Sequence, residues 1–147
     1  RSLRSVVELA ALGEMSITLD WDVLNADGGT RCASITGAWL ALRLALGQRV
    51  AKNVLTHMPL RGQVAAGSCG LTQAGPVLDL DYEEDSAAAA DTNFVLTADR
   101  RIVEIQGTAE ESPFTEDAFN ELFALARTGV SVLFDAQTLA VETAENR

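Results

Sequence analysis

A glycine-rich turn at residues 27–31, DGGTR, is the first segment whose residue types could do chemistry. Its two glycines allow the backbone to turn tightly and to approach a ligand with no Cβ in the way. A helix that began here would offer unpaired N–H groups and the positive end of its dipole to a phosphate, with Thr30 as a hydroxyl donor and Arg31 as a planar cation. An ordinary strand-to-helix turn with Arg31 in solvent explains the same residues, so the turn alone leaves phosphate binding open.

A second candidate is the acidic segment at 78–91, LDLDYEEDSAAAAD. Two convergent carboxylates could bind Mg²⁺, which keeps several waters and works with substrate phosphates. Asp85 and Asp91 would point roughly 120° apart on one continuous helix, so they converge only if the backbone bends between them or if one lies outside a short helix. A solvated strand end, with Asp85 or Ser86 capping a turn of helix, is at least as good an interpretation of the residues alone.

The remaining polar residues give weaker signals. Glu104 is better interpreted as a charged residue on the surface than as a functional carboxylate. Cys32 has no general base beside it in the sequence, and we expect Cys32 and Cys69 to be the two free thiols of a cytosolic protein. His57 is the only histidine, which excludes chemistry that needs two imidazoles, such as histidine-rich zinc sites.

The spacing of apolar residues predicts the elements that would position these side chains. In the first third of the chain, residues 1–12 have helical spacing that ends at Gly13. Residues 15–23 alternate strictly between apolar and polar side chains, which predicts a half-buried strand. A long apolar helix follows over residues 30–48 and ends near Gly47.

The rest of the chain predicts two hairpins and a helical tail. Residues 83–91 form a turn or a short helix, and the tail over 113–143 is helical, with Thr115 as its N-cap and Gly129 as a candidate break. The hairpin strands are expected over residues 63–73 and 76–83, then over 93–97 and 101–108. This order predicts a single α+β domain over residues 1–147, in which apolar helices cover one face of a mixed sheet.

Composition bounds the function classes. The chain has 147 residues, of which 48% are apolar and 22% are charged, a profile typical of a globular domain. No membrane-spanning run and no secretory signal is visible in the sequence. The formal charge of −10 argues against a basic nucleic-acid-binding surface. The charge is uneven: residues 1–70 have a balance of +2 and residues 71–147 one of −12, and such an acidic half can repel a polyanion or hold a divalent metal.

Four motifs in order resemble the bacterial RNase PH family. They are DWDVLNADGGTR at 20–31, ASITGAW at 33–39, LDYEEDSAAAADTN at 80–93 and VEIQGTAEESPF at 103–114. The QGTAE sequence is closer to the bacterial single-domain enzymes than to the exosome ring subunits or polynucleotide phosphorylase, which share the fold. The resemblance implies an RNase PH-like fold with a left-handed β-α-β crossover, an exception to the usual right-handed rule.

The resemblance also assigns roles to residues. It implies that Gly29, Thr30 and Arg31 bind inorganic phosphate, and that Asp85 and Asp91 are the catalytic and Mg²⁺-associated carboxylates. The implied reaction is phosphorolysis, in which phosphate attacks the last phosphodiester of an RNA 3′ end and releases a nucleoside diphosphate. The implied substrate is the 3′ trailer of precursor tRNA, and the implied enzyme is a cytoplasmic homo-oligomer, a hexameric ring with no membrane association.

The resemblance covers about the C-terminal three fifths of the family's length. The sequence starts at Arg1 within a predicted helix, and we expect the family's N-terminal part to be absent from this chain and present, where the enzyme is active, as a separate fragment. That part supplies further strands and arginines in the family. Two alternatives stay open: a non-catalytic RNA-binding or scaffold subunit of an RNase PH-type ring, and an inactive fragment.

Overall fold

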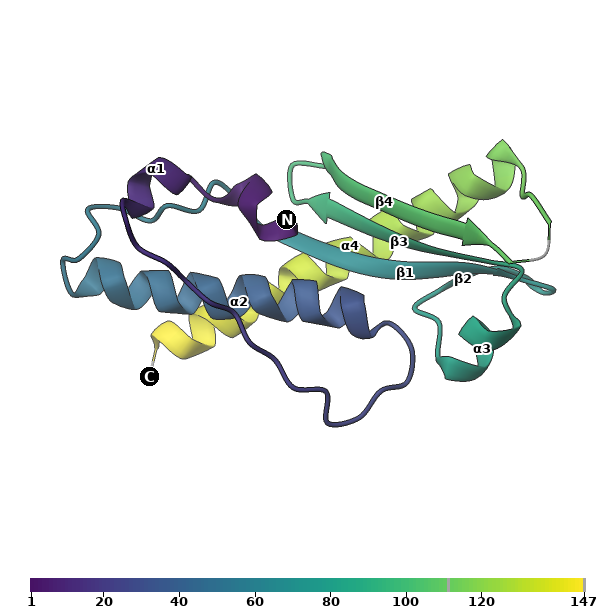
Figure 1. The fold of residues 1–147 in the computed structure, drawn as a ribbon, viewed down its shortest axis with the longest axis horizontal. Helices are drawn as coiled ribbons and strands as arrows, with labels where there is room; N and C mark the ends of the chain where they lie inside the picture. Colours follow the sequence, from purple (N-terminus) through teal and green to yellow (C-terminus); the bar gives the residue numbers. More distant parts are fainter. Residues whose placement is uncertain (111, 147) are drawn as a thin grey trace.

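The centre of the protein is a four-stranded antiparallel sheet in the order β2-β1-β3-β4 (Figure 1). A computed structural model describes residues 1–110 and 112–146; Glu111, within the fourth motif, lies outside them. Both predicted hairpins are confirmed, although the sheet is antiparallel and not mixed. The strands are β1 (Val64–Thr72), β2 (Gly75–Leu78), β3 (Ala90–Thr97) and β4 (Ile102–Ala109).

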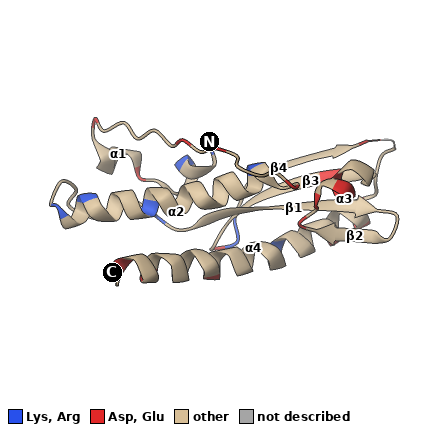
Figure 2. Cartoon of the chain, turned by 90° about the horizontal axis from the view of Figure 1, so that it is seen from below, with Lys and Arg blue, Asp and Glu red and all other residues tan. Residues whose placement is uncertain are grey.

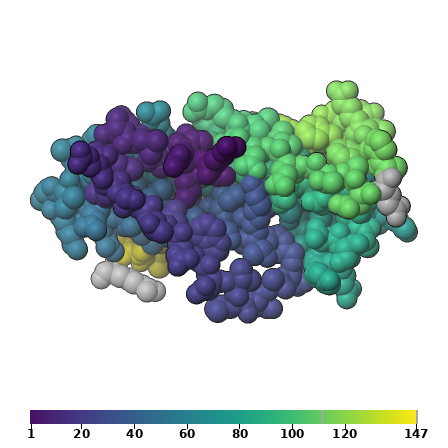
Figure 3. All heavy atoms as spheres, in the orientation of Figure 1, coloured from purple at the N-terminus to yellow at the C-terminus, as the bar shows by residue number. Residues whose placement is uncertain are grey.

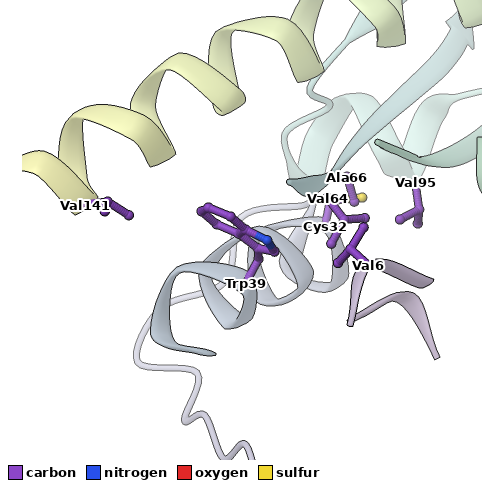
Figure 4. Packing of buried hydrophobic residues seen from close by; sticks show 7 residues of the cluster. All are labelled: Val6, Cys32, Trp39, Val64, Ala66, Val95 and Val141. Atoms are coloured by element: carbon purple, nitrogen blue, oxygen red, sulfur yellow. The ribbon is translucent and has the colours of Figure 1, made fainter. Parts of the chain in front are cut away.

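Two long helices, α2 (Thr30–Ala51) and α4 (Glu116–Glu145), cover opposite faces of this sheet, so the prediction that the helices share one face is wrong. Alternate residues of β1 separate the two sides. Val64 and Ala66 pack in one core cluster with Cys32 and Trp39 of α2 (Figure 4), whereas Ala65 packs in a second cluster with residues of α4. Figure 2 shows β1 running between the two helices.

One edge of β1 is left open by its neighbour, because β2 pairs only with the last four residues of β1. Side chains of the two helices occupy this edge. The Ala66 N–H donates to the Thr36 hydroxyl (3.1 Å) on α2. The buried Gln137 amide on α4 donates both to the Val64 carbonyl (3.1 Å) and to the Thr36 carbonyl (3.0 Å). Hydrogen bonds that a further strand would otherwise make are thus made by helix side chains.

Both long helices continue through glycines that were expected to end or break them. The Thr115 hydroxyl accepts from the Ala118 N–H (3.2 Å), which confirms the predicted N-cap of α4. A Cβ on Gly129 would lie 2.8 Å from Leu78, so this glycine allows α4 to approach β2 rather than breaking the helix. Gly47 likewise lies inside α2, which ends at Ala51.

No helix in the described part of the chain is long and apolar enough to cross a bilayer.

The N-terminal predictions are wrong in their element types. The predicted first helix is a 3-10 turn, η1 (Ser2–Val6), and a short α1 (Leu9–Leu12), separated because extended Val7 bridges to Leu60. Residues 15–23 form no strand, since no strand lies beside them in the described structure, and a β-α-β crossover around α2 is therefore not formed. The segment is buried on one side only: its apolar residues Met15, Ile17 and Leu19 pack against a third core cluster.

We expect Gln137→Leu to lower the free energy of unfolding by about 1–3 kcal/mol, because the Val64 carbonyl at the open edge would be left buried without its donor. Chemical denaturation measures this change. Gln48→Leu is the matched control, since Gln48 is exposed on α2, and it should change stability by less than about 0.5 kcal/mol. Equal effects of the two substitutions would show that the edge of β1 does not depend on Gln137.

Candidate functional site

The DGGTR turn ends where α2 begins. Gly28 and Gly29 both have left-handed backbones, with φ of 76° and 57°. Gly29 is the N-cap of α2 and supplies no side-chain cap, so the N–H groups of the first helical turn are not satisfied by a capping side chain. The predicted phosphate residues Gly29, Thr30 and Arg31 therefore lie together at the positive end of a 22-residue helix.

This turn packs against the acidic segment, although some fifty residues separate them in sequence. A Cβ on Gly28 would lie 2.1 Å from the Leu80 carbonyl oxygen, so only glycine fits there. The Tyr82 N–H, at the start of α3 (Tyr82–Ala87), donates to Asp27 Oδ1 (3.2 Å). The first two candidate segments thus lie in contact, and Figure 1 shows α3 beside the start of α2.

The Arg31 guanidinium forms an ion pair with Glu104 of β4. Neither interpretation of Arg31 from the sequence included this partner, because residues 31 and 104 are brought together only by the packing of α2 on the sheet. The Arg31 side chain is still 43% exposed, and a guanidinium has five N–H donors, so most of them stay available to an anion. Thr30, Arg31, Glu104, Trp21 and Arg1 line one open cavity of about 730 Å³.

The segment leading into α2 arches away from the body of the protein, as the space-filling view shows (Figure 3). A cavity of about 630 Å³ lies beneath it, against the first turns of α2. Apolar residues of this segment are exposed, among them Trp21 (57%) and Leu24 (97%). The helix start is therefore open to solvent on two sides.

Asp85 and Asp91 lie on different elements. α3 ends at Ala87, Ala88 is extended, and Asp91 already belongs to β3, so the chain has the bend between the two aspartates that their convergence requires. Asp91 pairs with Gly70 and with Thr108 across the sheet. The cap of α3 is Asp81, in a capping box with Glu84, and not Asp85 or Ser86 as expected.

Asp91 belongs to the sheet face that α2 covers. Two residues along β3, Asn93 Oδ1 accepts from Cys32 Sγ of α2 (2.8 Å), which identifies this face. α2 begins only two residues before Cys32, and beyond its start the Leu80 side chain packs over Gly70, the residue that pairs with Asp91. Asp91 is half-buried and Asp85 is exposed, and acidic residues gather at α3 (Figure 2).

The placement of the Asp85 and Asp91 carboxylates can be compared with the ligands that a Mg²⁺ site needs. Within residues 1–110 and 112–146, no group of three or more His, Cys, Asp or Glu side chains is placed to hold a metal ion. Mg²⁺ commonly takes one or two protein carboxylates and completes its octahedron with waters and substrate phosphates. The described residues therefore show no site that would hold an ion through protein ligands alone, and binding of Mg²⁺ by Asp85 and Asp91 together with a substrate phosphate stays a prediction.

Two residues of the site were missed in the sequence. Asp79 has a left-handed backbone (φ 61°) and its Oδ1 lies 3.6 Å from the position that a Cβ on Gly29 would take. Ser68 Oγ lies at the same distance from that position, and it is buried with no hydrogen-bond partner. Asp79 was one of six acidic residues in its segment, and Ser68 a small residue in an apolar strand, so neither carried a signal.

The two cysteines are free and buried, which agrees with the expected thiols. Burial raises the pKa of Cys32 to about 11; the Arg31 charge lowers it in part, and the carboxylates of Asp79 and Glu104 raise it further. Burial likewise raises the pKa of Cys69 to about 12. A neutral thiol is a poor nucleophile, so the helix start does not activate Cys32.

We expect both thiols to resist iodoacetamide at pH 8 in the folded protein and to react after unfolding in denaturant. The folded protein keeps these protons to higher pH than the unfolded chain, whose thiols titrate near 9.0. Their contribution to stability is therefore complete below pH 9 and is lost between pH 9 and about 11–12. A double Cys32→Ala, Cys69→Ala variant should show a smaller loss over that range, and an identical loss would contradict this assignment.

We expect Gly28→Ala to lower the free energy of unfolding by at least about 2 kcal/mol, because the new Cβ would meet the Leu80 carbonyl in a left-handed backbone. Gly37→Ala is the matched control. Gly37 lies inside α2 with nothing within 4 Å of the added Cβ, so alanine there should stabilise the protein by about 0.5–1 kcal/mol. Thermal unfolding of the pair tests the contact, and opposite signs are expected.

Comparisons with known proteins place this chain among relatives. The family model "3' exoribonuclease family, domain 2" matches residues 62–129. Proteins named ribonuclease PH from two strains of Caulobacter vibrioides are each 58% identical over 141 residues, which is 96% of this chain. The chain spans 59% of the length of these relatives. A crystal structure of rice (Oryza sativa) Rrp46 matches with a TM-score of 0.63 at 15% identity, over 82% of this chain and 51% of that one.

Proposed function

The chain is a homologue of ribonuclease PH, with an RNase PH-like α+β fold, and on that premise we propose that it carries the phosphate-binding and carboxylate residues of a phosphorolytic 3′-to-5′ exoribonuclease. The observation that carries the proposal is the meeting of two segments at the start of α2. The N-terminus of α2, which has no capping side chain, and the Arg31 guanidinium suit an anion. The acidic segment that packs against this helix start suits a cation that accompanies RNA phosphates.

In this proposal Gly29, Thr30 and Arg31 bind inorganic phosphate. The backbone N–H groups of the first turn and the Thr30 hydroxyl donate to phosphate oxygens, and the guanidinium of Arg31 adds charge-assisted bonds. Glu104 accepts one of the Arg31 N–H groups and so holds the guanidinium at the helix start. Substrate phosphate is thereby fixed in orientation before it reacts.

The reaction is an in-line exchange of two oxygens at one phosphorus. An oxygen of the bound phosphate forms a bond to the last phosphorus of the RNA while the bond from that phosphorus to the preceding 3′ oxygen breaks. The 3′ oxygen leaves with the shortened RNA and takes a proton, which a carboxyl of Asp85 or Asp91 is suited to pass. Asp85 and Asp91 would also hold Mg²⁺, which when bound neutralises charge on the transferred group. The products are a nucleoside diphosphate and an RNA one residue shorter.

The substrate and the assembly follow from the resemblance to the RNase PH family and are proposals for this chain. We expect the RNA to be a tRNA with 3′ trailer nucleotides, and the active form to be a homo-oligomeric ring of six. The chain spans 59% of the length of the relatives, and we expect activity to require polypeptide equivalent to the remaining two fifths. The acidic balance of residues 71–147 supports this requirement, since RNA binding needs basic surface from elsewhere in the assembly.

We expect the intact protein, with Mg²⁺ and a 3′-extended tRNA, to release nucleoside diphosphates only when inorganic phosphate is present. Asp85→Asn and Asp91→Asn should each lower the rate by about 100-fold or more, as loss of a general acid or a metal ligand does. Arg31→Ala should raise the KM for phosphate. Chromatography of the released nucleotides measures all three.

Asp135→Asn is the matched control, because Asp135 is exposed on α4 and loses the same charge. Its rate should equal that of the parent. Release of nucleoside monophosphates in the absence of phosphate would show hydrolysis and contradict the proposal. RNA binding without release of any nucleotide would favour the non-catalytic subunit.

A further inference from the structure

Ser68 is a buried hydroxyl without a partner, and it points at the start of α2. The residue is only 7% exposed, and its Oγ makes no hydrogen bond. It pairs across the sheet with Asn93, the residue that contacts Cys32, so it lies on the face that α2 covers. A polar group left unpaired inside a protein costs folding free energy unless something else satisfies it.

Asp79 lies beside this hydroxyl. Its N–H donates to the Ser68 carbonyl (2.8 Å), which fixes residue 79 next to Ser68, and its backbone is left-handed. Asp79 Oδ1 and Ser68 Oγ both lie 3.6 Å from the position that a Cβ on Gly29 would take. Because Gly29 has no side chain, a hydroxyl donor and a carboxylate acceptor border one small space at the N-cap of α2.

A carboxylate at an anion site needs a chemical explanation. It repels a fully ionised anion, yet it accepts a strong hydrogen bond from an anion that still carries a proton. Near neutral pH inorganic phosphate keeps at least one P–OH group, whereas sulfate keeps none. The other charged groups at the helix start are Arg31 and Arg1, which attract either anion, Glu104, which is paired with Arg31, and Asp27, which accepts from the Tyr82 N–H.

We propose that Asp79 and Ser68 make the site selective for phosphate over sulfate: Asp79 accepts the hydrogen bond of the phosphate P–OH, and the Ser68 hydroxyl donates to another phosphate oxygen. This inference rests on the proposed function, because it takes the start of α2 to be the phosphate site. It adds a specificity-determining pair to Gly29, Thr30 and Arg31. No bond is made or broken at this step.

The test is the affinity of the intact protein for inorganic phosphate and for sulfate, measured by calorimetry. The parent should bind phosphate more tightly. Asp79→Asn should reduce the ratio of the two affinities about tenfold or more, because the amide no longer repels sulfate and no longer makes a charge-assisted bond. Asparagine tolerates a left-handed backbone, so this variant should fold. Asp135→Asn removes the same charge elsewhere and should leave the ratio unchanged.

Ser68→Ala should weaken phosphate binding severalfold. Its matched control is Thr92→Ala, since Thr92 carries the other buried hydroxyl without a partner in the described residues but lies on the opposite sheet face, next to Gly107. An unchanged affinity ratio in Asp79→Asn, with phosphate still bound through Arg31, would overturn this inference and leave the proposed function intact. A parent protein that binds no phosphate would overturn both.

Discussion

The open edge of β1 is the constraint on which the rest of the structure depends. A strand edge inside a protein needs donors and acceptors, and here two helices supply them through Thr36 and Gln137. Gln137 is buried to all but 3% of its surface and joins α4, α2 and β1 in one set of hydrogen bonds. A slip of either helix along the sheet would leave these groups unpaired, which makes the position of both helices specific in a way that apolar packing alone is not.

That position also sets the site. Thr36 lies six residues after Thr30, so its bond to β1 fixes the start of α2 about 9 Å away along the same helix. The helix start then lies over the part of the sheet that carries Ser68 and Asn93. Three left-handed residues, Gly28, Gly29 and Asp79, gather at this point. Of the three, only Asp79 is not a glycine, and such a conformation at a residue with a side chain is typical of sites whose geometry is held by the surrounding fold.

Local signals in the sequence were sufficient for the elements that depend on local chemistry. The GGT sequence predicted a helix start at Thr30, and Thr115 followed by acidic residues predicted the start of α4. Contacts over long distances decided the rest. Gly129 continues its helix because β2 approaches there, and residues 15–23 form no strand because alternation cannot supply a pairing partner. The bend between Asp85 and Asp91 could be stated as a requirement, but neither Ser68 nor the partner of Arg31 could be found without the packing of α2.

The charge distribution explains why such a site must work through directed hydrogen bonds. Close to the start of α2 the described residues provide Arg31 and Arg1 as cations, against the carboxylates of Glu104 and Asp79 and the acidic segment at α3. Net attraction for an anion is therefore small, and salt would screen what there is. The N–H groups of a helix start are fixed in direction and cost no reorganisation when a ligand arrives. A weakly cationic site of this kind discriminates between anions by where their protons and lone pairs lie, whereas a strongly cationic one would accept any anion of the right size.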